Sequence, residues 1–229
     1  MSQTNPALTA DISLILCTYG RVNEVNNFLK SIYAQTIKPA EIIIVDQNEK
    51  EILKELINEW QPKLSIKHKR VNFKGASKSR NYGAREAKFS LIAFPDDDCL
   101  YPSKLVEEIA NLFQCHPKID VVLASKIELS EIHDVPTELT LCHSRVSSIL
   151  DLFKAKAETS NIFTRRSILK SLSYVFDENI KAHNDYFILQ SGLLSIIESK
   201  IPFLFSPNTF EYSEFDKTGL IEDHHHIDS

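Results

Sequence analysis

Cysteine is scarce in this chain, and its copies are widely spaced. The four cysteines, Cys17, Cys99, Cys115 and Cys142, form no Cys-x-x-Cys pair. That spacing argues against a zinc ribbon and against a small disulfide-bonded scaffold. We therefore expect reduced thiols and a cytoplasmic location.

An excess of positive charge and long hydrophobic runs are missing as well. The net charge is −5 at pH 7, which gives no basic surplus of the kind that nucleic-acid binding requires. No apolar run approaches the ~20 residues of a membrane-spanning helix. The polar residues 1–11 lack the hydrophobic region of a signal peptide. We expect no nucleic-acid partner, and at most a peripheral membrane contact at the inner face of the plasma membrane.

What is present is an alternation of apolar runs and helical patterns. Residues 12–17 and 41–45 are short apolar runs, typical of buried strands. Between them, Asn23 is the expected N-cap of a helix whose apolar residues recur up to Ile32. A helix at 50–60 and a third strand at 64–71 complete a β-α-β-α-β order, which predicts a parallel sheet. The 229 residues suit one large α/β domain or two small ones.

Three adjacent carboxylates follow a later apolar run. Residues 91–94 read as a buried strand that ends at Pro95, and Asp96, Asp97 and Asp98 come next. They should lie past the carboxyl edge of the sheet, where open α/β sheets bind ligands. A hard divalent cation would relieve their mutual repulsion, and Asp96 and Asp98 could share one ion. A solvated acidic turn explains the triplet equally well from the residues alone.

A basic segment comes just before that strand. Residues 75–84 begin with small residues, which suits a loop that enters a helix, and helix N-termini attract anions. Lys78 and Arg80 add positive charge there. A solvated basic helix face is the alternative reading.

The second half of the chain gives weaker signals, and residues 130–145 read as loop and short strand. The expected elements are helices starting at Tyr101-Pro102 and running through Phe113, at 149–156 and at 183–189, strands at 120–124 and 203–205, and a strand from Thr159 that runs into a helix ending near Leu172.

Six motifs now stand in order along the chain. They are Thr18-Tyr19, Val45-Asp46-Gln47, the loop from Gly75 to Asn81, Phe94-Pro95-Asp96-Asp97-Asp98, Ser160-Asn161 with Arg165-Arg166-Ser167, and Phe176-Asp177-Glu178 with Asn184-Asp185. The series resembles the family 2 glycosyltransferases over residues 11–212. The resemblance implies a GT-A fold, an α/β architecture with a Rossmann-like, mostly parallel sheet flanked by helices. It also implies inverting transfer of a sugar from a nucleotide-sugar donor, with Mg²⁺ or Mn²⁺ as cofactor.

The same resemblance divides the chain and names its partners. It implies a single domain over 1–229, with a nucleotide-sugar-binding half at about 11–125, an acceptor-binding half at about 126–212 and a tail at 213–229. The donor would be a UDP- or dTDP-sugar and the acceptor a glycan or a lipid-linked glycan. By analogy, the setting would be bacterial surface-polysaccharide synthesis.

Roles for single residues also come from the resemblance. It places the catalytic base at Asp185 and the metal ligands at Asp98 and Asp96. The implied nucleotide-sugar-binding residues are Cys17, Thr18, Tyr19, Arg21, Asp46, Gln47, Lys78, Arg80, Asp96 and Asp97. Gln47 stands where the family has a second acid, so a carboxylate contact becomes an amide contact. Asn184 stands where the family has a Glu before the base.

Two further features refine the expectation. Trp60 is the only tryptophan, so the Gln-x-x-Arg-Trp motif of processive members is absent and we expect addition of one sugar. Asp177 and Glu178 match a turn that we interpret as structural. His224, His225 and His226 could ligate a metal, but we interpret them as part of a flexible tail.

Three other classes of protein would need different residues in this chain. A sugar-1-phosphate nucleotidyltransferase would need a glycine-rich loop after the first strand, and residues 17–21 contain only Gly20. A non-catalytic nucleotide-sugar-binding module would be expected to lose the base or the metal ligands, and Asp98 and Asp185 are both present. An aspartate-phosphorylated domain would need an Asp nucleophile on the first strand, which ends instead in Cys17-Thr18.

Overall fold

The first half of the protein alternates strands and helices, as the hydrophobic pattern predicts. The computed structural model describes residues 9–128, 144–146, 159–171, 176, 178 and 203–213. The elements in chain order are β1 (Thr9–Thr18), α1 (Val22–Tyr33), β2 (Lys38–Asp46), α2 (Lys54–Trp60), β3 (Ile66–Arg70), α3 (Ala76–Glu86), β4 (Leu91–Ala93), β5 (Cys99–Leu100), α4 (Leu105–Cys115), β6 (Val121–Glu128), β7 (Ser144–Val146), the 3-10 helix η2 (Thr159–Asn161), β8 (Ile162–Arg165), α6 (Arg166–Ser171) and β9 (Phe203–Ser213).

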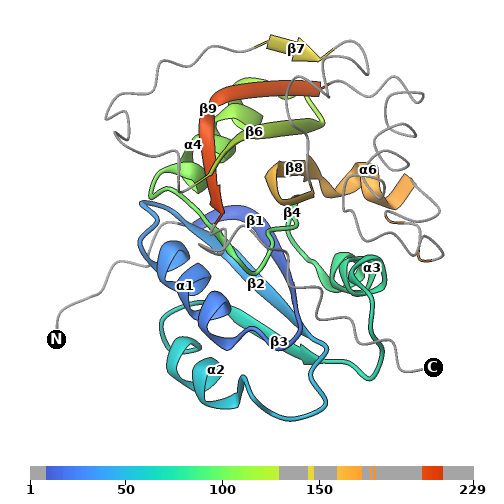
Figure 1. Ribbon diagram of the computed structural model, residues 1–229. Coiled ribbons are helices and arrows are strands. Elements are labelled where there is room, and N and C mark those ends of the chain that lie inside the picture. Colours follow the sequence, from blue (N-terminus) through green and yellow to red (C-terminus); the bar gives the residue numbers. More distant parts are fainter. Residues whose placement is uncertain are drawn as a thin grey trace, which may run out of the picture.

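One sheet joins the strands of these described segments. Its order is β3-β2-β1-β4-β8-β6-β9-β5, and β7 pairs with β9. The strands β3, β2, β1 and β4 are parallel neighbours. Beyond β4 the sheet is mixed, because β8 is antiparallel to both β4 and β6 while β6 and β9 run parallel. The predicted α/β fold, with a mostly parallel sheet flanked by helices, is confirmed (Figure 1).

The two faces of the sheet carry different helices, because side chains alternate along each strand. Alternate residues of β1, such as Leu14 and Leu16, pack in a buried cluster with apolar side chains of α1, α2 and α4. Ile15 lies on the other face, in a smaller buried cluster with Ile43 and Val45. Figure 1 shows α3 on this second side of the strands, opposite α1 and α2.

Gly83 lets α3 lie unusually close to β1. A Cβ atom at this position would stand 2.3 Å from Cγ2 of Ile15 and 3.3 Å from Cγ2 of Val45. Such a separation is far below van der Waals contact, so any larger residue would push the helix off the sheet. The seating of α3 matters for the site described below, because the same helix carries Arg80.

Several element boundaries differ from the sequence-based expectation in the first half. Arg21, not Asn23, occupies the N-cap position of α1, and its side chain makes no capping hydrogen bond. The helix expected at 50–60 begins only at Lys54, after a turn in which the Lys54 amide donates to the Glu51 carbonyl at 3.2 Å.

The helix expected from Tyr101 begins at Leu105. The Gln35 side-chain amide donates to the carbonyl oxygens of Tyr101 at 3.2 Å and of Pro102 at 2.7 Å. The Pro102 carbonyl also accepts from the Leu105 amide at 2.9 Å, so Gln35 ties the segment just before α4 to the end of α1.

Other boundaries differ in the second half. The strand expected from Thr159 begins at Ile162, since residues 159–161 form η2. The strands expected at 120–124 and 203–205 extend to Glu128 and Ser213. The two-residue strand β5 was not predicted. The helices expected at 149–156 and 183–189 lie outside the described residues.

None of the helices in the described segments is long and apolar enough to cross a membrane.

Candidate functional site

The acidic triplet lies at the carboxyl edge of the sheet, as predicted. It follows β4 and directly precedes β5, whose Cys99 and Leu100 pair with Ser213 and Tyr212 of β9. The Cys99 amide also donates to the Asp96 carbonyl at 3.3 Å. The loop is therefore fixed at both ends, which holds three like charges together at one point of the sheet.

Two arginines meet the three carboxylates. Nη1 of Arg21 donates to Oδ1 of Asp97 at 3.0 Å and to Oδ2 of Asp98 at 2.7 Å. Nη2 of Arg80 donates to Oδ1 of Asp96 at 2.7 Å. The Arg21 side chain is 48% exposed, whereas that of Arg80 is 6% exposed. The two guanidinium groups thus offset much of the charge of the triplet, one from the surface and one from inside.

The pKa values near the triplet reflect burial. Burial raises the pKa of Asp97 to about 6, although Arg21 acts in the opposite direction and Asp98 and Asp96 add to the rise. Burial also raises the pKa of the Cys17 thiol to about 12. A raised pKa favours the neutral thiol at physiological pH, and a neutral thiol is a poor nucleophile.

The residues at the triplet fit a divalent cation. Asp96, Asp98 and Cys99 each offer a ligand atom, and these atoms lie within 4.8 Å of one another. Mg²⁺ and Mn²⁺ prefer oxygen ligands, so the two carboxylates that were assigned from the sequence suit such an ion. Cys99 was not predicted at this point, although it stands directly after the triplet.

The turn after β1 is fixed by a hydrogen bond to Asn48, which follows the end of β2. Oδ1 of Asn48 accepts from the Gly20 amide at 2.7 Å, and Gly20 has φ +77°, a left-handed conformation that favours glycine. The turn leaves Tyr19 half-exposed, at 52%. Nζ of Lys74 lies 3.1 Å from the Tyr19 hydroxyl and 4.7 Å from the ring centroid. An exposed aromatic ring beside an ammonium group is suited to stacking against a planar base.

Asp46 lies at the buried end of β2 and its two oxygens already have partners. Oδ1 accepts from the amide nitrogen of Asn48 at 2.9 Å and from its side chain at 2.7 Å, and Oδ2 lies 2.9 Å from Nε2 of His68. Burial raises the pKa of Asp46, but the hydrogen bonds from His68 and Asn48 outweigh that effect and lower the pKa overall. The carboxylate is thereby held ionised beneath the turn.

Asn48 and His68 therefore belong to the candidate site, although the motifs did not include them. Their sequence signals were the polar strand end at 46–48 and the alternation of side chains along 64–68. Gln47 connects the same strand end to α3, because its Oε1 accepts from the Gly75 amide at 2.7 Å. Gly75 has φ +122° and precedes the first residue of α3.

Lys78 and Arg80 point to different places. Lys78 is exposed, and its ammonium lies 4.7 Å from the centroid of the Phe73 ring. Arg80 reaches Asp96 and also lies over the ring of Phe176 at 5.7 Å. The basic residues that were predicted together thus divide between the surface and the triplet.

Neighbouring Asn81 ties α3 to the later chain. Its side-chain amide donates to the Phe176 carbonyl at 2.8 Å and to Oε1 of Glu178 at 3.0 Å. The Phe176 amide donates back to Oδ1 of Asn81 at 3.0 Å. These contacts tie Phe176 and Glu178 to α3.

The structure gathers most of the predicted residues but leaves some outside its described segments. Those at one edge of the sheet are Cys17, Thr18, Tyr19, Arg21, Asp46, Gln47, Lys78, Arg80, Asp96, Asp97 and Asp98. The predicted base Asp185, its neighbour Asn184 and the histidines 224–226 lie outside the described residues.

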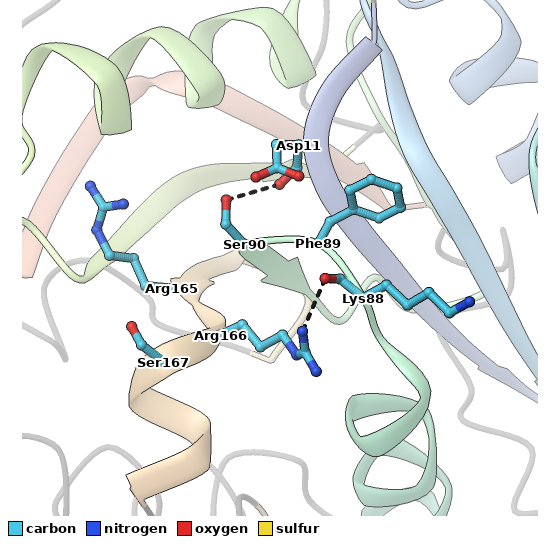
Figure 2. Close-up of a pocket in the computed structure, with 7 residues that line it drawn as sticks. All are labelled: Asp11, Lys88, Phe89, Ser90, Arg165, Arg166 and Ser167. Carbon is cyan, nitrogen blue, oxygen red and sulfur yellow. Dashed lines mark hydrogen bonds between the residues drawn. The ribbon is translucent and has the colours of Figure 1, made fainter.

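A hollow of about 400 Å³ lies near the opposite, amino edge. Figure 2 shows its lining, which consists of Asp11, Lys88, Phe89, Ser90, Arg165, Arg166 and Ser167. Nη1 of Arg166 donates to the Lys88 carbonyl at 2.9 Å, and the Lys88 ammonium points away from both arginines. Nε of Arg165 donates to the Ile119 carbonyl at 2.8 Å, and its Nη2 to the Phe113 carbonyl at 3.1 Å. These guanidinium groups connect segments of the backbone.

A second hollow, of about 300 Å³, lies between α2 and the end of β3. Its lining includes His68, Arg70, Glu51 and Lys54. His68 joins this hollow to the buried Asp46 through their 2.9 Å contact.

Comparison with families identifies the chain. The model of the family described as glycosyl transferase family 2 matches residues 13–172. An uncharacterized glycosyltransferase of Haemophilus influenzae is 34% identical over 112 residues, which are 48% of this chain and 37% of that protein. An uncharacterized glycosyltransferase of Rickettsia typhi is 24% identical over 182 residues, 76% of this chain and 56% of that protein.

Solved structures share the fold. TarS of S. aureus has a TM-score of 0.70 at 19% identity, over 89% of this chain and 36% of that one. The mannosyltransferase PcManGT of Pyrobaculum calidifontis, in complex with GDP-Man and Mn²⁺, has a TM-score of 0.63 at 16% identity, over 94% of this chain and 60% of that one. The chain therefore spans just over a third of the length of TarS and of the H. influenzae relative.

Proposed function

The chain belongs to glycosyl transferase family 2, and from that premise we propose that it transfers one sugar from a nucleotide-diphosphate sugar to an acceptor, with inversion at the anomeric carbon. The observation that carries the proposal is the convergence of Asp96 and Asp98 at the carboxyl edge of the sheet, the same edge at which the exposed ring of Tyr19 follows β1. A nucleotide-sugar needs both features, an aromatic surface for the base and a charged site for the diphosphate.

The proposed donor is a UDP- or dTDP-sugar. TarS has been solved in complex with UDP and with UDP-GlcNAc, which supports a pyrimidine nucleotide for this chain. Thr18 and Tyr19 would contact the base from the turn that Asn48 holds. Asp46 would set the position of that turn and of the ribose, and Gln47 would place the loop into α3. Lys78, at the exposed start of α3, would meet the phosphates.

The proposed cofactor is Mg²⁺ or Mn²⁺, held by Asp98 and Asp96. When bound, the ion would act as a Lewis acid that neutralises charge developing on the diphosphate leaving group. PcManGT contains Mn²⁺ with its GDP-Man, which supports a divalent ion here. Asp97 is buried and less suited to ligation, so its proposed part is to hold Arg21 at the site.

The roles that we propose for acceptor binding and for the catalytic base come from the sequence resemblance. We assign the general base to Asp185, the acceptor-binding half to residues 126–212 and one domain to the whole chain. The acceptor would be a glycan or a lipid-linked glycan of bacterial surface-polysaccharide synthesis, reached by a cytoplasmic enzyme with at most peripheral membrane contact. Because the processive motif is absent, the enzyme would add a single sugar.

Two other functions make different demands on the same edge. A sugar-1-phosphate nucleotidyltransferase would have to cradle a triphosphate after β1, yet the turn there offers one glycine, and Asn48 already binds its amide. A non-catalytic module would bind nucleotide-sugars without turnover. Both give outcomes in the experiment below that differ from those of a transferase.

A screen of nucleotide-sugars tests the proposal. The protein is incubated with UDP-, dTDP-, GDP- and CMP-sugars, each in Mn²⁺ and in EDTA, and both the melting temperature and the release of nucleoside diphosphate are measured. We expect one UDP- or dTDP-sugar to stabilise the protein and to be slowly hydrolysed in Mn²⁺ but not in EDTA. Stabilisation without hydrolysis, with or without candidate acceptors, would favour the binding module. Turnover of a nucleoside triphosphate with a sugar phosphate would favour the nucleotidyltransferase.

A further inference from the structure

Arg21 lies between two of the three carboxylates of the triplet. A single nitrogen, Nη1, donates to Oδ1 of Asp97 and Oδ2 of Asp98, at 3.0 and 2.7 Å. Asp98 is also the residue that the proposed function assigns as the main metal ligand. An oxygen that accepts from a guanidinium group has less negative charge to offer to a cation, and the two positive groups repel each other at short range.

Arg21 and Arg80 differ in how firmly they are held. Arg80 has a side chain that is 6% exposed and packs over the ring of Phe176. Arg21 stands at the N-cap of α1, and its side chain is 48% exposed. Within the described part of the chain, its guanidinium group binds the carboxylates of Asp97 and Asp98. Of the two, Arg21 can therefore move with less disturbance, because its contact with Asp98 lies at the surface.

The donor offers Arg21 another partner. A guanidinium group binds phosphate with the same paired geometry with which it binds carboxylate. The β-phosphate of a nucleoside diphosphate would have to lie near the metal ligands for the proposed chemistry, within the range of a long side chain at the same edge. Asp98 could thus pass from Arg21 to the ion while Arg21 turns to the diphosphate.

We propose, on the basis of the proposed function, that Arg21 is the resident counter-ion of the triplet, and that it exchanges Asp98 for the diphosphate when the donor and the ion bind, while Asp97 keeps it at the site. The ion alone then binds weakly, because it must displace a guanidinium group from Asp98. The nucleotide and the ion bind cooperatively, since each removes an obstacle to the other. This arrangement disfavours a stray divalent ion at the site in the absence of donor.

The test is the affinity for Mn²⁺ alone, measured by calorimetry without nucleotide. Wild type is compared with Arg21→Gln. The control is Arg85→Gln, which removes one positive charge from the last turn of α3. We expect Arg21→Gln to bind Mn²⁺ about 10-fold more tightly than wild type, as the loss of a unit charge at contact distance allows. Arg85→Gln should stay within about twofold, because a distant exposed charge is screened. Equal or weaker Mn²⁺ binding by Arg21→Gln would overturn the inference.

A second variant covers the case in which the uncharged side chain prevents folding. Arg21→Lys keeps the charge, but its ammonium is more strongly hydrated and lacks the planar fork. It should therefore hold the carboxylates less well and tighten Mn²⁺ binding by about threefold, and unchanged affinity would again count against the inference.

The failure of the proposed function can be told apart from the failure of this inference. If Arg21→Gln binds Mn²⁺ more tightly but no nucleotide-sugar is turned over, the counter-ion stands without the transferase. If wild type turns over a donor and Arg21→Gln shows no gain, the transferase stands without the counter-ion.

Discussion

The two edges of the sheet use arginine in opposite ways. At the carboxyl edge, Arg21 and Arg80 bind side-chain carboxylates. At the amino edge, Arg165 and Arg166 bind mainly backbone carbonyl groups, those of Ile119, Phe113 and Lys88, although Nε of Arg165 also lies 3.8 Å from Oδ1 of Asp120. A backbone carbonyl cannot move away from an arginine without a change in the backbone of its segment. A carboxylate on a surface loop can change partners, so the carboxyl edge is suited to binding and the amino edge to architecture.

The amino edge owes its arrangement to the end of α4. The Phe113 carbonyl is among the last of this helix and has no partner within it, and Pro117 follows soon after. Nη2 of Arg165 donates to the Phe113 carbonyl at 3.1 Å and to the Pro117 carbonyl at 3.3 Å. A positive charge at a helix C-terminus is favourable as well. Arg165 thus completes the hydrogen bonding of the α4–β6 connection.

The largest effect is expected from the residue assigned to chemistry on the acceptor side. Asp185→Asn keeps the size of the side chain but removes its basicity, so it should leave donor binding near wild type and reduce turnover by roughly 10²-fold or more. Turnover on the true acceptor and calorimetry with UDP measure the two effects. The result would sharpen the division between donor and acceptor functions, because no carboxylate of the triplet would be affected.

Glu178→Gln is the matched control for that variant. Oε1 of Glu178 accepts from the Asn81 amide, a contact that a glutamine can keep. We expect nearly normal turnover from Glu178→Gln. If Asp185→Asn is nearly normal and Glu178→Gln is impaired, the base is Glu178 and the assignment of Asp185 is wrong.

The next effect concerns the stability of the amino edge. Arg165→Gln removes a charged donor from three backbone carbonyls and should lower the free energy of unfolding by about 2 kcal/mol. Arg166→Gln loses one such contact at an exposed site and should cost about 1 kcal/mol or less. Urea denaturation measures both. Neither change should alter UDP affinity, and a loss of affinity in a folded Arg165→Gln protein would break the proposed division between the edges.

The smallest effect is a pH dependence in the amino half of β2. Burial raises the pKa of Glu41, but hydrogen bonds from Lys67, Ser13 and the Lys88 amide outweigh it, and the net pKa lies below its usual value of 4.5. The stability that this carboxylate contributes is therefore present above pH 4.5 and is lost as the pH falls through the lower folded-state pKa. Glu41→Gln should be less stable than wild type at pH 7 by about 1 kcal/mol.

That difference should shrink at acid pH, as urea denaturation at several pH values would reveal. Glu59→Gln removes a carboxylate that is exposed and paired with Lys63, and it serves as the control. A gap between wild type and Glu41→Gln that stays constant down to acid pH would show that packing, rather than charge, is what the variant loses.

The sequence alone could predict which residues lie at the carboxyl edge of the sheet. The triplet follows an apolar strand that ends at a proline. Residues that come directly after a buried parallel strand lie at the carboxyl edge of the sheet, so the position of the carboxylates could be predicted. Tyr19 and Gln47 likewise follow strands of the same parallel sheet. Their gathering at one edge follows from the parallel order of β2, β1 and β4, which the hydrophobic pattern predicts.

Contacts between distant residues could not be foretold in the same way. The pair His68–Asp46 spans 22 residues, and the contacts of Arg21 with Asp97 and Asp98 span 76 and 77. Such partners depend on the register between strands and on rotamers, neither of which hydrophobic periodicity fixes. Element ends moved for a similar reason. Tyr101 and Pro102 precede the helix expected there, and their carbonyl groups accept from Gln35, 66 and 67 residues away in the chain.

The most direct test of the account is the metal dependence of UDP binding. UDP is titrated by calorimetry into wild type and Asp98→Asn, each in Mn²⁺ and in EDTA. We expect wild type to bind at least about 10-fold more tightly in Mn²⁺, and Asp98→Asn to lose most of that gain because one anionic ligand is gone. Equal UDP affinity of the wild type in Mn²⁺ and in EDTA would contradict the claim that the acidic triplet is a metal-assisted donor site.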